Sequence, residues 1–485
     1  MNRVFVGIDI GTTAIKIAAT DEHMTPLYEN DYLYDCITLP NGWIEIEPTI
    51  WKDLVFHAID EMIEHHPYQI TAIGITGQMH TTVFLDKNGQ SVRPAILWND
   101  MRTKDLIPQL KQFLGSQMNL SSSQQKAISN GSPIANIFWL KTNEMELYRC
   151  VDKVVMPVNY VNFTLTGQLS LDYCDASTTG LFDLEKRTWC SDIFRILEFS
   201  PTIFPTLIPA SNVVGYLLPD LCERWQQNNS VAIIAGTGDN VASALATGSF
   251  DTEQPVISLG TSGVLVFPNR KSKLNKVGKN VIAEIVANDL TMISQGTVQT
   301  GAKLNSWWLE NIVGRKDYSS AQDEIISSKL GSNPVFFIPH LKGEKTLFAN
   351  PNLRGAFFGL GLDTEQSDMY LAVLEGLAFG MKMLFDQMNN LQNIQYLSIV
   401  GGGAKSRLWV EVFANIFNYP IKRIISPCEA VHGAIRLAIM SQNIELKENL
   451  EEEVVYPTDE LVKQYQKQYE IYHRWTKLLV HHSYE

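Results

Sequence analysis

The sequence GIDIGTTAI at residues 7–15 decides the fold, because a closely similar sequence, VISLGTSGV, recurs at residues 256–264. In each stretch a β-rich run leads into a turn made of Gly and hydroxyl residues, and a second β-rich run follows. Turns of this composition between two β-rich runs predict tight β-hairpins. The recurrence of one such hairpin in both halves of the chain indicates a duplicated domain.

The segments that follow the two hairpins also match. In each half an apolar helical pattern leads to a buried strand that ends in a turn beginning with Gly, in the same order. The chain is therefore predicted to be an α/β protein of two related domains, residues 1–245 and residues 246–485. The matched segments are helix 51–63, strand 72–76 and turn 77–80 in the first half, and helix 369–385, strand 396–400 and turn 401–403 in the second.

Composition limits both the class of protein and its partners. The chain has 485 residues, of which 45% are hydrophobic and 19% charged, which is typical of folded globular domains. This length exceeds what one hydrophobic core usually organises, so two large domains are expected. The net charge of −13 disfavours nucleic acids and anionic membranes as partners.

Cysteine usage and the N-terminal sequence predict a soluble, cytoplasmic protein. The six cysteines are scattered, without a CxxC pair or a Cys/His cluster at metal spacing, so reduced thiols are expected. The N-terminal apolar run contains Asp9 and ends in a Gly-Thr turn, which is typical of a strand and not of a signal peptide. No uninterrupted apolar span is long enough to cross a bilayer.

The two hairpin tips are candidate phosphate-binding turns. A Gly-Thr-Thr or Gly-Thr-Ser-Gly turn directs several N–H groups and hydroxyls into one space, which suits a polyphosphate. For either tip alone, the alternative is an ordinary hairpin turn. Two matched tips that face each other could hold a triphosphate from opposite sides, and this favours the phosphate site.

Asp9 lies in the middle of the first apolar strand. A carboxylate is unfavourable in such a place unless a metal ion or hydrogen bonds compensate its burial. Beside a phosphate-binding turn, we expect Asp9 to hold hydrated Mg²⁺. The alternative is an Asp that hydrogen-bonds the local backbone.

The segment IIAGTGDN at residues 233–240 presents Asp239 at the start of a helical run of small residues. Its glycines let the backbone approach a ligand closely, and the helix start leaves N–H donors free for anionic groups. Asp239 is therefore placed to accept a proton from a substrate hydroxyl as that oxygen attacks phosphorus. The alternative is a helix N-cap.

Taken together, these motifs resemble those of the FGGY carbohydrate kinases, which belong to the actin-like ATPase superfamily. The resemblance covers essentially the whole chain and implies two duplicated actin-like ATPase (ribonuclease H-like) domains flanking a deep cleft. It also implies ATP and Mg²⁺ as cofactors, and a small sugar or sugar acid as phosphoryl acceptor. The motifs are GIDIGTT at 7–13, GQMH at 77–80, LWNDMR at 97–102, GTGDN at 236–240, SLGTSGV at 258–264 and GGGAKS at 401–406.

The resemblance implies roles for individual residues. Asp239 is the catalytic base, and Asp9 and Asp239 frame the Mg²⁺ site. The residues implied to contact the sugar, together with Asp239, are Gln78, Met79, His80 and Asn240. The residues implied to contact ATP are Thr12, Thr13, Gly260 and Thr261 at the phosphates, and Gly301, Asn305, Gly402, Gly403 and Ala404 around the rest of the nucleotide.

Within the family, GQMH followed by RPAILWND at residues 93–100 most resembles the kinases that phosphorylate D-xylulose on O5. Three segments depart from that pattern, and added bulk near the sugar is expected to mark a related substrate. Gluconate, another ketopentose or a polyol are therefore the alternatives. The departures are Thr81-Thr82 where Gly usually follows GQMH, Gly343-Glu344-Lys345-Thr346-Leu347 in place of GERTP, and Thr237 within a usual Gly triplet.

Two other classes of protein remain to be weighed against a sugar kinase. An actin-like filament or chaperone-type ATPase would hydrolyse ATP without a sugar, and would have no use for the GQMH and GTGDN turns together. A non-catalytic sugar sensor would be expected to lack Asp9 or Asp239, and both are present. We therefore expect a sugar kinase; a homodimer is expected only because symmetric dimers are the commonest assembly.

Overall fold

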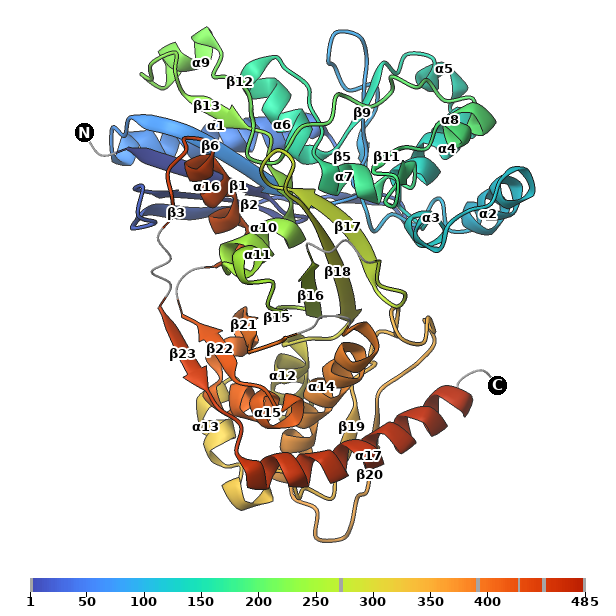
Figure 1. Ribbon diagram of the computed structural model, residues 1–485, viewed down its shortest axis with the longest axis vertical. Helices are drawn as coiled ribbons and strands as arrows, with labels where there is room; N and C mark the ends of the chain where they lie inside the picture. Colours follow the sequence, from blue (N-terminus) through green and yellow to red (C-terminus); the bar gives the residue numbers. More distant parts are fainter. Residues whose placement is uncertain (1–2, 270–273, 390–392, 426–427, 447–450, 483–485) are drawn as a thin grey trace.

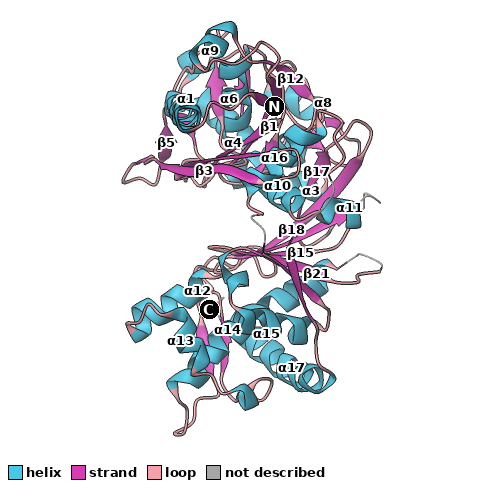
Figure 2. Ribbon diagram, turned by 90° about the vertical axis from the view of Figure 1, so that its left-hand side faces the viewer, coloured by secondary structure: helices cyan, strands magenta, loops and turns pink. Residues whose placement is uncertain are grey.

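The computed structural model describes residues 3–269, 274–389, 393–425, 428–446 and 451–482. Within these residues, most strands belong to two seven-stranded sheets, one in each half of the chain. Figure 1 shows the first sheet with its helices in the upper part of the molecule and the second sheet in the middle, above most helices of the second half; Figure 2 shows the upper and lower parts from another side. The predicted α/β fold, with a mixed sheet in each of two domains, is confirmed.

The central strands of the two sheets have the same arrangement. The first strand of each pairs antiparallel with its hairpin partner and parallel with the strand after the long helix. The first sheet runs in the order β12 (Val213–Tyr216), β13 (Ala232–Ile234), β6 (Ile70–Gly77), β1 (Val4–Ile10), β2 (Ala14–Thr20) and β3 (Pro26–Leu33), with β14 (Thr237–Gly238) also beside β6. The second runs β17 (Lys279–Glu284), β18 (Leu290–Val298), β16 (Gly263–Asn269), β15 (Val256–Leu259), β21 (Leu397–Val400), β22 (Ile421–Ile424) and β23 (Glu452–Val455).

Smaller sheets complete the strand set. Their strands are β4 (Ile37–Thr38) with β5 (Ile44–Ile46) and β8 (Ala95–Ile96), β7 (Val83–Leu85) with β9 (Lys153–Val155), β10 (Phe182–Asp183) with β11 (Thr188–Trp189), and β19 (Phe336–Ile338) with β20 (Ala356–Phe358).

The two helices predicted between hairpin and strand are present and extend beyond the predicted bounds. They are α1 (Pro48–His65), which begins with Pro and buries one face, and α14 (Gln366–Met388), which is buried along most of its length. No helix in the described part of the chain is long and apolar enough to cross a membrane. The other helices are α2 (Leu106–Gln117), α3 (Ser122–Ala127), α4 (Pro133–Asn143), α5 (Met145–Tyr148), α6 (Pro157–Thr166), α7 (Tyr173–Thr178), α8 (Ser191–Leu197), α9 (Pro219–Arg224), α10 (Asp239–Ala246), α11 (Ser249–Thr252), α12 (Lys303–Ser306) with a π-helical continuation (Trp307–Val313), α13 (Tyr318–Asp323), α15 (Arg407–Phe417), α16 (Ala430–Met440) and α17 (Asp459–His482), with 3₁₀ turns at Ser327–Lys329 and Gly402–Lys405.

Helix α16 comes from the second half of the sequence but lies on the first sheet, against β1, β6 and α10 (Figure 1). The contact is at backbone distance: a Cβ at Gly74 would lie 2.0 Å from the carbonyl oxygen of Ala434, and one at Gly433 would lie 1.9 Å from that of Ala242. Glycine is therefore required at both positions. The predicted domain boundary between residues 245 and 246 stays a prediction, with α16 reaching back across it.

Strand β17 also joins the two halves. It packs on α7 of the first half, and the Ile282 N–H donates to Oγ of Ser177 over 3.0 Å. At its end, the Ala210 N–H donates to the Glu284 carbonyl over 2.7 Å. The second sheet is thus tied by main-chain groups to the part of the first domain that carries α7.

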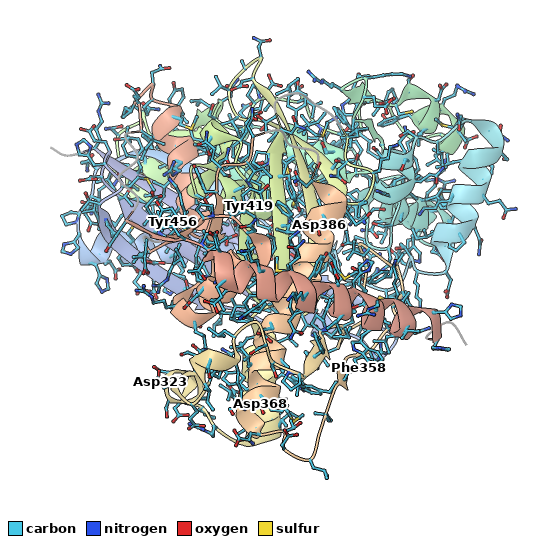
Figure 3. All side chains as sticks on the ribbon, turned by 60° about the horizontal axis from the view of Figure 1, so that its bottom comes forward. Asp323, Phe358, Asp368, Asp386, Tyr419 and Tyr456 are labelled. Atoms are coloured by element: carbon cyan, nitrogen blue, oxygen red, sulfur yellow. The ribbon has the colours of Figure 1, made fainter. Side chains whose placement is uncertain are left out.

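The C-terminal helix α17 closes the apolar core of the second domain. Figure 3 shows it running across this domain between the labelled Phe358 and Asp386. Trp475 stacks on Phe358 with ring centroids 4.7 Å apart, and the Tyr469 hydroxyl donates to Oδ2 of Asp386 over 2.8 Å. Deeper in the same interface, the Tyr465 hydroxyl donates to Oε1 of buried Glu375 on α14 over 2.9 Å.

Glu375 is expected to make the second domain less stable at high pH. Burial raises its pKa from 4.5 to about 8, although hydrogen bonds from Tyr465 and Asn333 oppose the shift. Because the folded-state pKa lies above the unfolded one, its contribution is complete below pH 4.5 and is lost as the pH rises towards about 8. Glu375→Gln should therefore gain stability over the parent protein between these values, on the order of a few kcal/mol at pH 8.

Urea unfolding of both proteins from pH 5 to pH 9 measures this difference. Glu470→Gln, which changes an exposed glutamate on α17, is the control and should follow the parent. A constant difference between Glu375→Gln and the parent at all pH values would contradict the assignment.

Candidate active site

The first hairpin and the turn after β6 lie side by side at one edge of the first sheet. Strands β1 and β6 are parallel, with Ile10 opposite Gly77, so their carboxyl ends meet. The Gln78 N–H donates to the Ile10 carbonyl over 2.9 Å, which brings the turn against the hairpin tip. At that tip Thr12 is half-buried and Thr13 exposed, so both can reach a ligand.

Asp9 carries a buried carboxyl oxygen, Oδ1, that has no hydrogen-bond partner. The pKa of Asp9 is raised from 3.8 to about 7, chiefly by burial and next by the charge of Asp239. Two neighbouring carboxyl groups, one with an unpartnered oxygen, fit Mg²⁺, which takes a few carboxylate ligands and keeps several waters. Among the described residues, no three His, Cys, Asp or Glu side chains gather as a ready metal cage. The other ligand positions would thus be left to water and phosphate.

Asp239 begins α10 directly after the Gly-rich turn. Gly236 has a φ of +76°, and a Cβ there would lie 1.9 Å from the Ile75 carbonyl oxygen, so only glycine lets the turn lie against β6. Burial raises the pKa of Asp239 to about 6, although the Asn240 N–H donates to its Oδ1 over 2.7 Å and opposes the shift. Such a carboxyl group is suited to accept a proton near neutral pH.

Thr237 anchors the Gly-rich turn that precedes Asp239. Its Oγ1 donates to Oδ2 of buried Asp172 over 2.7 Å, and its carbonyl accepts from Oγ1 of Thr76 over 2.7 Å. Thr237 is completely buried. This departure from the Gly triplet therefore ties the turn to α7 and β6, and the side chain adds no bulk at the surface of the site.

The turn after β6 places His80 and Met79 near the start of α10. His80 has a φ of +70°, and its Nδ1 is buried without a partner. Burial, and next the charge of Lys279, lower the pKa of His80 to about 3. The imidazole is thus neutral at pH 7, with one nitrogen that donates and one that accepts. Asn240 contacts Sδ of Met79 through Nδ2 over 3.6 Å.

Gln78 and the two threonines after the turn point into the protein. Gln78 donates from Nε2 to the Gly11 carbonyl over 3.1 Å and accepts at Oε1 from Thr81 over 2.9 Å, so both ends of its amide are occupied by the protein. Thr82 donates to the His80 carbonyl over 3.1 Å. Thr81 and Thr82 are both 0% exposed. The expectation that they add bulk near the sugar is wrong, because their hydroxyls are used to hold the turn.

The second hairpin tip, the start of α12 and the Gly triplet after β21 form a second cluster. The Gly301 N–H donates to the Thr261 carbonyl over 2.9 Å, and the Ala302 N–H to the Gly260 carbonyl over 2.7 Å. Gly403 lies against Leu259 at the end of β15. The structure therefore brings together the predicted nucleotide residues Gly260, Thr261, Gly301, Gly402, Gly403 and Ala404.

Asn305 joins this cluster through a chain of side chains. The Tyr370 hydroxyl donates to Oδ1 of Asn305 over 2.5 Å, and Nε2 of Gln322 donates to the same hydroxyl over 3.4 Å. Oε1 of Gln322 then accepts from Oγ of Ser406 over 2.7 Å. Asn305 on α12 and the segment that follows the Gly triplet are thus held at a fixed separation.

Sequence reasoning missed several charged groups around the site. Lys16 lies opposite Asp9 in the hairpin and forms an ion pair with Glu429 at the start of α16. The register of a tight hairpin could have placed Lys16 beside Asp9. Asp175 on α7 is buried, with both carboxyl oxygens unpartnered, and its pKa is raised well above 3.8 by burial and by Asp172 and Asp239. Nothing in its local sequence marks it.

The LWNDMR motif divides into a structural part and a part at the site. Arg102 pairs with Asp100 over 2.8 Å and with Glu45 over 2.7 Å, and its side chain is fully buried. Trp98 instead reaches the first hairpin, where its indole Nε1 donates to Oγ1 of Thr12 over 3.1 Å. Trp98 therefore hydrogen-bonds a predicted ligand-binding residue, whereas Arg102 is used within the protein.

Models of the FGGY family of carbohydrate kinases match nearly the whole chain. The N-terminal domain of that family matches residues 4–246, and the C-terminal domain matches residues 256–442.

Relatives and solved structures agree with these matches. The xylulose kinase of Lactococcus lactis is 31% identical over 86% of this chain and 84% of its own, and that of Staphylococcus xylosus is 29% identical over 96% and 98%. The crystal structure of a xyloylose kinase from Brucella ovis has a TM-score of 0.89 at 27% identity, covering 99% of this chain and 100% of that one. The crystal structure of a gluconate kinase from Lactobacillus acidophilus, at 22% identity and a TM-score of 0.88 over 99% of each chain, shows the same fold.

Gly402 and Gly403 allow a packing contact to be separated from a ligand contact. A Cβ at Gly403 would lie 2.9 Å from Cβ of Leu259, whereas a Cβ at Gly402 meets no atom within 4 Å. We expect Gly403→Ala to lower the free energy of unfolding by about 1–3 kcal/mol. Gly402→Ala should change it by less than about 0.5 kcal/mol but weaken ATP binding.

Urea unfolding without nucleotide and calorimetric titration with ATP measure the two effects separately. Unchanged ATP affinity in a normally folded Gly402→Ala variant would remove Gly402 from the nucleotide site.

Proposed function

The chain belongs to the FGGY family of carbohydrate kinases, and on this premise we propose that it transfers the γ-phosphate of ATP to the O5 hydroxyl of D-xylulose. Curated relatives along nearly the whole chain are named xylulose kinases, and this supports the choice of sugar. The observation that carries the mechanism is the buried Asp239 at the start of α10, close enough to Asp9 for its charge to raise the pKa of Asp9.

Asp239 is the general base of the reaction. It accepts the proton of the sugar hydroxyl as that oxygen attacks the γ-phosphorus of ATP and the bond to the β,γ-bridging oxygen breaks. The Asn240 N–H uses one lone pair of Oδ1 of Asp239, and the remaining lone pairs of the carboxylate are left for the substrate hydroxyl and for Mg²⁺. Asp9 and Asp239 would hold Mg²⁺, which when bound neutralises charge on the phosphoryl oxygens.

The sugar lies along the turn after β6. Neutral His80, with an unpartnered buried nitrogen, hydrogen-bonds a sugar hydroxyl, and Met79 supplies an apolar contact beside it. Asn240 adds an amide from the first turn of α10. These groups orient the primary hydroxyl towards Asp239, which is the main contribution that positioning makes to phosphoryl transfer.

ATP lies between the two hairpin tips. Thr12 and Thr13 contact its phosphates from the first domain, and Gly260 and Thr261 from the second, through N–H groups and hydroxyls. The rest of the nucleotide lies along Gly301, Asn305 and the turn 402–404. In this arrangement the first domain, residues 1–245, binds the sugar, and the second, residues 246–485, binds the nucleotide.

An aldonate such as gluconate is a second candidate substrate, because Lys279 lies near His80 and Lys345 lies near Lys279. Lys279 begins β17, which packs on α7, and its charge contributes to the lowered pKa of His80. Desolvation of its ammonium group, and next the charge of Lys345, lower the pKa of Lys279. A pair of cations in such surroundings attracts a carboxylate, which gluconate carries and D-xylulose lacks.

Asp239→Asn is expected to lower kcat by about 10²–10⁴-fold, because the amide cannot accept the hydroxyl proton, while ATP and sugar still bind. ADP release is measured against D-xylulose, L-ribulose, L-xylulose, glycerol and D-gluconate. Asp323→Asn, which changes an exposed residue, serves as the matched control. Near-normal turnover by Asp239→Asn would disprove the base assignment, and ADP release without dependence on any sugar would favour a plain ATPase.

Lys279→Met distinguishes the two candidate substrates. If an aldonate is the substrate, its KM should rise about tenfold or more through loss of the cation, while the low activity on D-xylulose is unchanged. If D-xylulose is the substrate, its KM should change by less than about twofold. Lys87→Met, at an exposed turn, is the control. An unchanged KM for gluconate in an enzyme that prefers gluconate would refute the role of Lys279.

A further inference from the structure

A closed ring of hydrogen bonds joins the turn after β6 to the tip of the first hairpin. The backbone N–H of Trp98 donates to Oγ1 of Thr81 over 3.2 Å, and Thr81 donates to Oε1 of Gln78 over 2.9 Å. Nε2 of Gln78 donates to the Gly11 carbonyl over 3.1 Å. The next residue, Thr12, receives the indole Nε1–H of Trp98 over 3.1 Å and so closes the ring.

The chemistry of these groups fixes the direction of every bond in the ring. The Gly11 carbonyl can only accept, so the Gln78 amide must present nitrogen to it and oxygen to Thr81. Thr81 therefore donates to that oxygen and uses a lone pair for the Trp98 N–H. The indole N–H can only donate, so Oγ1 of Thr12 accepts, and its own hydroxyl hydrogen is left to donate elsewhere.

We propose that Thr81 and Trp98 are positioning residues that orient the Thr12 hydroxyl as a hydrogen-bond donor to the phosphates of ATP. The inference rests on the proposed function in one respect, namely that Thr12 meets the phosphates. A threonine hydroxyl can donate or accept, and only the donating orientation is favourable beside an anion. The ring removes the other orientation before the ligand arrives, which reduces the cost of organising the site.

The ring also connects the sugar side of the site to the phosphate side. Gln78 is followed directly by Met79 and His80, the residues assigned to the sugar. A displacement of this turn would therefore pull on the Gly11 carbonyl through the Gln78 amide. The ring thus joins the turn to the hairpin tip, while the His80 carbonyl is held separately by Thr82.

The hairpin tip has a second support that does not pass through Thr81. The Tyr34 hydroxyl also donates to the Gly11 carbonyl, and the indole Nε1 of Trp51 donates to that hydroxyl over 3.0 Å. Removal of the Thr81 hydroxyl should therefore leave the hairpin folded but the Gln78 amide free to rotate. The expected result is a functional loss on the ATP side with the overall fold retained.

The test compares Thr81→Val with Thr82→Val. The two residues are adjacent and both are 0% exposed, and each substitution replaces a buried hydroxyl with a methyl group, so general effects on packing should be shared. Thr81→Val should raise the KM for ATP about tenfold with less than about a twofold change in the KM for sugar. Thr82→Val removes the hydrogen bonds to the His80 carbonyl and from Asn136. It should raise the KM for sugar about tenfold and change the KM for ATP by less than about twofold. Thr81→Ser keeps the hydroxyl and should restore the KM for ATP.

Trp98→Phe gives an independent measurement at a site where folding is not at risk. Trp98 is 42% exposed, so its replacement removes the indole N–H with little loss of packing. Calorimetric titration with ATP in the absence of sugar should show affinity reduced by about three- to tenfold in both Trp98→Phe and Thr81→Val.

These outcomes separate the two proposals. Wild-type protein that binds ATP but phosphorylates none of the five substrates of the ADP-release assay would refute the proposed function. The calorimetric titrations with ATP would still test the ring in that case. Equal effects of Thr81→Val and Thr82→Val on the KM for ATP, or wild-type ATP affinity in both Trp98→Phe and Thr81→Val, would overturn the inference.

Discussion

The main-chain contact between α16 and the first sheet is the constraint on which the site depends. Gly74 and Gly433 let backbone meet backbone, at β6 and at α10, and a contact without side chains cannot adjust by changing rotamers. Asp9 lies on β1, beside β6, and Asp239 is the first residue of α10, which packs on α16. The separation of the two carboxyl groups is therefore set by packed backbone, which is the most rigid support that a protein offers. This is the arrangement that a reaction controlled by positioning requires.

This placement brings the buried carboxyl groups of Asp9 and Asp239 close together, and the protein alone compensates their charge only in part. Burial and mutual repulsion raise the pKa of Asp9, and an oxygen of that residue is left without a partner. Lys16 lies opposite, but its ammonium group is shared with Glu429 at the start of α16. The nearby carboxyl group of Asp172 is instead hydrogen-bonded by Thr237. An unpartnered carboxyl oxygen beside a second buried carboxyl group is typical of a site built for a ligand.

Sequence alone predicted most of what depends on local pattern. The two hairpins, helices α1 and α14, and the strand-turn positions of Asp9 and Asp239 follow from periodicity and turn composition, and strand pairing then brings them together. What the sequence could not show depends on side-chain direction. Thr81, Thr82 and Thr237 looked like added bulk at the sugar, because a residue beside a binding turn can face either way. Their burial, and the occupation of both ends of the Gln78 amide, became visible only with the backbone in place. The packing of α16 on the first sheet likewise depends on long-range contacts, and no local sequence pattern specifies it.

The two hairpins show how a duplicated element can diverge in its supports while its tip keeps one composition. The second tip is held through main-chain bonds from Gly301 and Ala302, whose N–H groups can only donate. The first tip is also held by main-chain bonds, from the N–H groups of Gln78 and Tyr34, and in addition by the side chains of Gln78, Tyr34 and Trp98, which come from three separate segments. Each side-chain support ties the position of the first tip to the segment that carries that side chain. One of these side chains, Gln78, comes from the turn that also carries Met79 and His80, the residues proposed to contact the sugar. The divergence therefore adds side-chain supports at the tip beside the proposed sugar contacts, where two ligands would have to be aligned.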